Sequence, residues 1–277
     1  HGGAAIGPEP LERLARRAAT GAALARSGRW SGYYRLSAGK TVLVIDAGPP
    51  PAPRMAGIGH TGTLAFEMSD GPDRLVTNCG GSRGLPAPLA GPLAAGLCTT
   101  AAHSTLVIAD TNSTRIRDDG TLGAGVSEVA VQLRTSEAGQ WLDASHDGYA
   151  RRFGMLVRRR LFLSPDGQDL RGEDVIEPVP GKLLRRSDRD FDIRFHLGPG
   201  VSATPTADGA GALIKLPHGK VWAFKVRFDA AGGQVSIEPS LWVDQAGTIQ
   251  KTQQLVISAR THRAGGDIGW SFRRAGK

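Results

Sequence analysis

The chain of 277 residues has few cysteines, tyrosines and methionines, with two, three and three of each. Two cysteines cannot form a disulfide framework. Cys79 and Cys98 flank one loop, so a single bridge between them is one alternative; the other, which we expect, is two free and partly buried thiols. Neither lies in a Cys-x-x-Cys pair, and no histidine partner is evident from the sequence.

Long apolar runs are also missing, so the sequence predicts no membrane-spanning segment. No signal peptide is visible, but the chain begins at His1, and we expect it to be a fragment of a longer protein. The sequence contains no zinc finger, helix-turn-helix or aromatic stacking signature, which argues against a nucleic-acid partner. It also has no phosphate-binding loop and no nucleophile elbow.

The net charge is +8, and two interpretations stay open. Scattered basic residues can simply keep a protein soluble. They can also attract a polyanion, such as an acidic polysaccharide or a membrane surface. Hydrophobic residues make up 40% of the chain, enough for a sizeable core, and 38 glycines with 17 prolines indicate many turns.

The apolar spacing changes from helical to alternating near residue 33. Before that point, Leu11, Leu14 and Ala18 share one face of an expected helix that ends at Ser27-Gly28. Beyond it, alternation predicts an all-β fold, a large antiparallel two-sheet β-sandwich preceded by one short N-terminal helix. We expect residues 80–96 to form a loop without regular structure. The expected strands cover residues 33–36, 41–46, 64–69, 74–78, 104–109, 126–135, 152–164, 170–176, 192–197, 212–216, 220–228, 234–238, 253–258 and 268–272.

Polar side chains inside expected strands need partners. The run Arg158-Arg159-Arg160 alternates between strand faces, so at least one arginine should point inward, with Glu173 or Asp174 as its carboxylate. His196 is predicted either to reach an interior or cleft position or to lie on a solvated face.

Two histidines and an asparagine each lie at a strand edge or turn: His60, Asn78 and His103. If their strands are neighbours, these three side chains could supply a zinc shell of nitrogen and oxygen ligands. The alternative is that each histidine is a hydrogen-bonded surface residue.

The sequence blocks around these residues, 59–69, 75–80 and 100–107, resemble in their order the C-terminal domain of heparinase II/III-like polysaccharide lyases. That resemblance implies a β-sandwich at residues 31–277, with residues 1–30 as the remnant of a preceding α/α toroid. It implies zinc as cofactor, with His60, Asn78 and His103 as ligands; Asn78 stands where the family has aspartate. The family's catalytic histidine falls on Ile58, so no catalytic residue is expected in this chain, and the catalytic tyrosine belongs to the toroid.

The resemblance implies that the domain helps to cleave a uronate-containing acidic polysaccharide by β-elimination. It would form one wall of the cleft, with its own toroid as partner, and the fragment alone would be inactive. The family further implies a location in the bacterial periplasm or cell envelope. The alternative is a non-catalytic carbohydrate-binding or structural sandwich, favoured by Ile58 and Asn78.

A polar cluster at His146-Asp147-Gly148-Tyr149 is a second candidate site. His146 and Tyr149 could bind substrate in the cleft. The alternative is a turn at Asp147-Gly148, after which the Tyr149 ring packs in the core and its hydroxyl bonds to the backbone.

Overall fold

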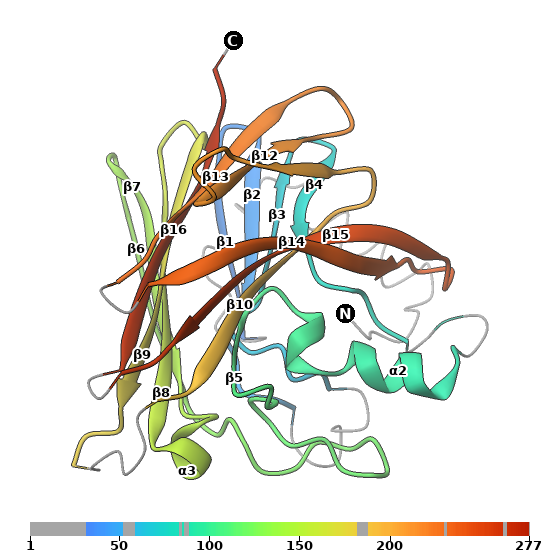
Figure 1. Cartoon of the computed structure of the whole chain (residues 1–277), viewed down its shortest axis with the longest axis vertical. Helices are drawn as coiled ribbons and strands as arrows, with labels where there is room; N and C mark the ends of the chain where they lie inside the picture. Colours follow the sequence, from blue (N-terminus) through green and yellow to red (C-terminus); the bar gives the residue numbers. More distant parts are fainter. Residues whose placement is uncertain are drawn as a thin grey trace, which may run out of the picture.

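The computed structural model describes residues 32–51, 59–82, 85, 89–181, 188–229, 232–262 and 265–276. Within these ranges two antiparallel sheets pack face to face, which confirms the predicted all-β sandwich (Figure 1). The expected N-terminal helix and Ile58 lie outside the described residues. No helix in the described part of the chain is long and apolar enough to cross a membrane.

The first sheet has the strand order β1-β2-β3-β4-β10-β15-β14, and β5 also pairs with β10. Its strands are β1 (Tyr33–Ala38), β2 (Thr41–Asp46), β3 (Phe66–Asp70), β4 (Asp73–Thr77), β5 (Leu106–Ile108), β10 (Asp190–Leu197), β14 (Gly233–Val243) and β15 (Ile249–Arg260).

The second sheet has the strand order β11-β12-β13-β16-β9-β8-β7-β6. Its strands are β6 (Val129–Ser136), β7 (Gly139–His146), β8 (Met155–Leu163), β9 (Asp169–Pro178), β11 (Ser202–Pro205), β12 (Gly211–Lys215), β13 (Val221–Arg227) and β16 (Gly266–Arg274). Every strand pair within the two sheets is antiparallel, so short turns can join most neighbours.

Aromatic side chains from both sheets meet in the core. Phe66 of β3 stacks on Trp270 of β16 with ring centroids 5.7 Å apart, and Phe195 of β10 contacts Phe224 and Phe272 at 5.5 and 5.4 Å. All five side chains are buried. Burial of such large apolar surfaces is the main force that holds the two sheets together.

One arginine lies inside this core. Arg159 of β8 is fully buried and forms a two-pronged ion pair with Asp174 of β9, with N···O distances of 2.7 and 2.9 Å. This confirms the prediction that one member of the arginine run points inward. The Trp270 indole N–H also donates to Asp174 Oδ2 at 2.8 Å, so the buried carboxylate is fully engaged.

Short helices depart from the predicted pattern. Helix α2 (Gly91–Leu97) overlaps the stretch expected to be a loop, and Leu97 packs against Cys79 and Val243 in a small second core. Helix α3 (Ala150–Phe153) delays the start of β8 to Met155, and a 3-10 turn, η2 (Thr100–Ala102), precedes β5. Strands β7 and β11 were not expected from the sequence.

Candidate functional site

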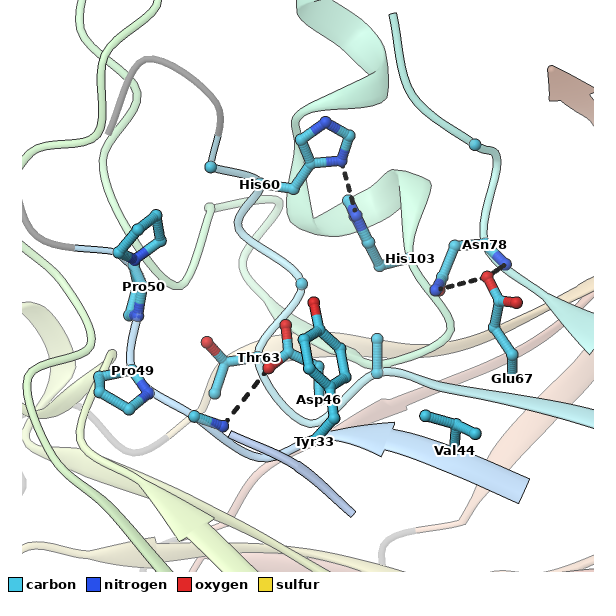
Figure 2. A pocket seen from close by; sticks show the side chains of 16 residues that line it. Tyr33, Val44, Asp46, Pro49, Pro50, His60, Thr63, Glu67, Asn78 and His103 are labelled. Atoms are coloured by element: carbon cyan, nitrogen blue, oxygen red, sulfur yellow. Dashed lines mark hydrogen bonds between the residues drawn. The ribbon is translucent and has the colours of Figure 1, made fainter. Parts of the chain in front are cut away.

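A cavity of about 480 Å³ opens on the outer face of the first sheet, beside β1, β2 and β3 (Figure 2). In these strands Leu43, Ile45 and Phe66 point into the core, and the alternate side chains point outward. The described side chains that form its polar lining are Tyr33, Asp46, His60, Thr63, Glu67, Asn78 and His103.

Two of the predicted residues touch each other there. His60 Nδ1 lies 3.1 Å from His103 Nε2, and the rings meet edge to face (Figure 2). His103 Nδ1 lies 2.7 Å from the Thr99 carbonyl oxygen, which can only accept, so this nitrogen carries the proton. His103 Nε2 therefore offers a lone pair, and His60 Nδ1–H donates to it. Burial lowers the pKa of His103 to about 4, which keeps this ring neutral at pH 7.

The third predicted residue is held by other groups. Asn78 Oδ1 accepts a hydrogen bond from the Ser104 N–H at 2.9 Å, and Asn78 Nδ2 donates to Glu67 Oε1 at 3.2 Å. Both ends of the amide are thus occupied. Glu67 was not singled out from the sequence, because its contact with Asn78 depends on how β3 and β4 pair.

The donor set fits a zinc ion only in part. Two imidazole nitrogens 3.1 Å apart could share a metal, since tetrahedral bonds of ~2.0–2.1 Å place neighbouring nitrogens slightly farther apart. The Asn78 oxygen, however, faces the Ser104 N–H. In the described part of the chain, no group of three His, Cys, Asp or Glu side chains is arranged to hold a metal.

Two further titratable groups line the cavity next to each other. Asp46 and Tyr33 are directly opposite partners in the β1–β2 hairpin. Burial raises the pKa of Asp46 to about 7, although the Gly48 N–H, 3.4 Å from Oδ1, partly opposes the rise. Burial and the nearby Asp46 and Glu67 raise the pKa of Tyr33 to about 12. Asp46 can thus exchange a proton near neutral pH.

Arg159 of the core forms hydrogen bonds to the two chain segments that carry the histidine pair. Its Nη1 donates to the carbonyl oxygens of Leu64 and Ser104, at 2.9 and 2.7 Å. Leu64 has a φ of 64°, a left-handed conformation that is unfavourable for leucine. Leu64 follows the His60 segment and Ser104 follows His103, so one buried cation fixes both chain segments that carry the histidine pair.

Of the two interpretations of the second candidate site, the structure agrees with the turn and not with a substrate-binding position. Tyr149 is fully buried, and its hydroxyl donates to the Thr111 carbonyl oxygen at 2.9 Å. His146 is also buried, and its Nδ1 accepts from the Gly148 N–H at 3.0 Å. Neither residue lines the cavity, and neither side chain is accessible to a polymer. The arrangement matches the alternative, a turn whose tyrosine packs inward.

Both cysteines are buried thiols that form no disulfide, as expected. Cys79 has a histidine partner that the sequence did not reveal: His196 Nδ1 lies 3.4 Å from its Sγ. His196 is buried and also contacts Ser240 and the Ala101 carbonyl oxygen. Burial raises the pKa of the Cys79 thiol to about 11, so this cluster is not that of a reactive cysteine.

Comparisons with known proteins agree with this architecture. A sequence model described as "Heparinase II/III-like, C-terminal" matches residues 20–271. A heparinase III structure superposes with a TM-score of 0.70 at 14% identity, covering 91% of this chain and 36% of that one. Heparan sulfate lyase HepC from Pedobacter heparinus also gives 0.70, at 12% identity, with 89% and 36% covered.

A curated relative, FtsZ-localized protein C from Caulobacter vibrioides, is 30% identical over 99% of this chain. The chain spans 48% of that relative's length. The matches define a β-sandwich domain of the kind found in heparinase III. This chain belongs to the heparinase II/III-like C-terminal family.

Proposed function

We propose that this domain forms one wall of a glycan-binding cleft in a polysaccharide lyase that acts on a uronate-containing polymer. The observation that carries the proposal is the His60–His103 contact inside a polar, open cavity next to Asp46. Proton donors and acceptors are gathered here beside the first sheet, on segments that Arg159 fixes, as acid–base chemistry requires.

β-Elimination requires three things: neutralisation of the uronate carboxylate, removal of the adjacent proton and protonation of the leaving oxygen. Asp46, with its pKa near 7, suits the last task, because it can hold a proton at neutral pH and release it. The neutral His103 orients His60 through their hydrogen bond. The described lining carries Asp46 and Glu67 but neither lysine nor arginine, so the uronate carboxylate must be neutralised by the opposite wall of the cleft.

The test is an assay of the longer protein that contains this domain. With a panel of uronate polymers, the unmodified protein should form an unsaturated, ultraviolet-absorbing product. His60→Ala and Asp46→Asn should each lower turnover by roughly a hundredfold, the usual contribution of a positioned proton-transfer group. Lys251→Ala, an exposed residue of β15, is the matched control and should be unchanged. Absence of product across the panel would rule the lyase out.

A second candidate is a non-catalytic carbohydrate-binding or structural sandwich. The engagement of Asn78 by Ser104 and Glu67 favours it, because only two of the three ligands of a metal site are then available. The name of the Caulobacter relative associates that protein with FtsZ, which would suit a structural role. Glycan binding without product would support this candidate.

Zinc binding and location stay predictions. Metal analysis of the purified protein, alongside His60→Ala and His103→Ala, tests the zinc proposal; equal and negligible zinc in all three would remove it. The family resemblance favours the periplasm or cell envelope, and fractionation of cells that produce the longer protein tests that location.

A further inference from the structure

Several basic residues lie together on the sheet face opposite the cavity. A shallow groove of about 490 Å³ runs over the outer face of β9, β16 and β13. Its lining contains four cations and one carboxylate, in contrast to the cavity near His60, whose described lining contains two carboxylates and neither lysine nor arginine. The charged residues of the groove are Asp169, Arg171, Lys225, Arg227 and Arg273.

One row of side chains crosses the sheet through this groove. Strand pairing aligns Trp141 of β7 with Phe162 of β8, Phe162 with Arg171 of β9, Arg171 with Ser271 of β16, and Ser271 with Lys225 of β13. Because these residues are directly opposite one another, they project from the same outer face. Four strand spacings of ~4.8 Å make the row about 19 Å long.

Aromatic rings form one end of the row. The Trp141 and Phe162 rings lie 4.9 Å apart, and the Arg171 guanidinium lies 5.8 Å from the Phe162 ring. Trp141 is 38% exposed, an unusual position for the largest apolar side chain. The ring and the cations thus offer adjoining apolar and positive surfaces.

Within the groove, four cations face one carboxylate, which leaves an excess of positive charge. Asp169 pairs closely with Arg171, at 2.7 Å, but lies 3.9 Å from Arg273. Glu173 lies 3.9 Å from Arg227. Lys225 forms no ion pair with any described residue. The arginine side chains of the groove are between 62% and 73% exposed, so they can reach a ligand at little cost in desolvation.

We propose that the outer face of the second sheet, from Trp141 to Lys225, binds a linear carboxylated or sulfated polysaccharide. The aromatic end stacks on sugar rings, and Arg171, Arg273 and Lys225 contact the anionic groups along the chain. A flat row of this length suits an extended polymer better than a small molecule, which needs an enclosing pocket. This surface is separated from the His60 cavity by the whole sandwich, so it holds the polymer without taking part in its cleavage.

Binding measurements on the full chain test the proposal. Heparin oligosaccharides and polygalacturonate are the anionic probes, and dextran is the neutral one. The unmodified chain should bind both anionic glycans, more weakly at higher salt, and should not bind dextran. Lys225→Ala/Arg273→Ala should weaken binding by roughly tenfold or more, in line with the loss of two contacts to anionic groups. Trp141→Ala should also weaken it.

Lys251→Ala on β15 is the matched control, an exposed lysine of the other sheet, and should bind like the unmodified chain. Poly-glutamate and phosphatidylserine vesicles test the other polyanions, and weaker binding of both supports a glycan. The proposal is overturned by unchanged affinity in Lys225→Ala/Arg273→Ala, by equal loss in Lys251→Ala, or by tighter binding of poly-glutamate or vesicles. Equilibrium binding requires no cleavage, so the result is independent of lyase activity.

Discussion

At the scale of single residues, three buried histidine rings have strongly lowered pKa values. Burial lowers the pKa of His103 and His146 to about 4 and that of His196 to about 3. Each ring is held by a backbone group, Thr99, Gly148 or Ala101, so each is neutral in the folded protein at pH 7. Acid should therefore destabilise the folded protein.

We expect the free energy of unfolding to fall as the pH drops from about 6.5 toward 4. In this pH range the unfolded chain binds protons that the buried histidines of the folded state do not bind, so acid favours unfolding. Moving the pKa of one imidazole from 6.5 to about 4 corresponds to roughly 3 kcal/mol. Urea unfolding gives the free energy of unfolding at pH 7 and at pH 4.5. Its decrease between these pH values should be about 2–3 kcal/mol smaller in His146→Gln than in the unmodified chain. Equal drops would contradict the account.

Arg159 supplies a second residue-scale prediction. Arg159→Ala should destabilise the fold by about 3–5 kcal/mol, because it leaves Asp174 buried without its partner. The neighbouring Arg160 is half exposed in its ion pair with Glu173, so Arg160→Ala should cost less than about 1 kcal/mol. Denaturant unfolding measures both variants. Similar costs would mean that the buried pair does not hold the two site segments as described.

At the scale of elements, the segment that carries His60 packs tightly against His103. A Cβ on Gly62 would lie 2.4 Å from His103 Cδ2, so Gly62→Ala must displace the imidazole. We expect this variant to break the His60–His103 hydrogen bond and shift the histidine ring signals in NMR spectra. Gly96→Ala is the control: it lies in α2 with no atom within 4 Å of the added Cβ and should be neutral or slightly stabilising. Unchanged ring signals in Gly62→Ala would argue against the pair.

Alternation along the strands predicted most of the fold. In β13, Trp222 and Phe224 point inward and Lys225 and Arg227 outward, as their spacing indicates. Strand β7 was missed because exposed Trp141 and small Ala144 weaken its pattern. Helix α2 was missed because its Ala, Gly and Pro residues give no apolar period, and it is fixed instead by the packing of Leu97.

The site was predictable only where a single side chain carried the signal. The histidines were singled out by type and position, and the structure brings His60 and His103 into contact. Glu67 and Asp46 were not, because their roles arise from strand register and burial. Tyr149 was weighed as a surface residue or a core residue, and only its packing against the Thr111 carbonyl oxygen distinguishes the two.

At the scale of the whole molecule, charge is divided between the two outer faces of the sandwich. The first sheet carries the cavity with Asp46 and Glu67, and the second carries the groove with its excess of arginine and lysine. The net charge of +8 was first interpreted either as solubility or as attraction to a polyanion. The four cations of the groove favour the second interpretation, and the two carboxylates make the cavity itself unfavourable to an anion while Asp46 is ionised.

The central claim, that a uronate glycan contacts the His60 cavity, is tested most directly by the pH dependence of binding. A short uronate oligosaccharide would be titrated into Lys225→Ala/Arg273→Ala, which weakens the proposed binding on the outer face of the second sheet. Affinity should rise as the pH falls through about 7, because Asp46 then gains a proton and no longer repels the uronate. The added substitution Asp46→Asn should abolish that rise. The same rise in its presence, or affinity that does not change with pH, would contradict the account.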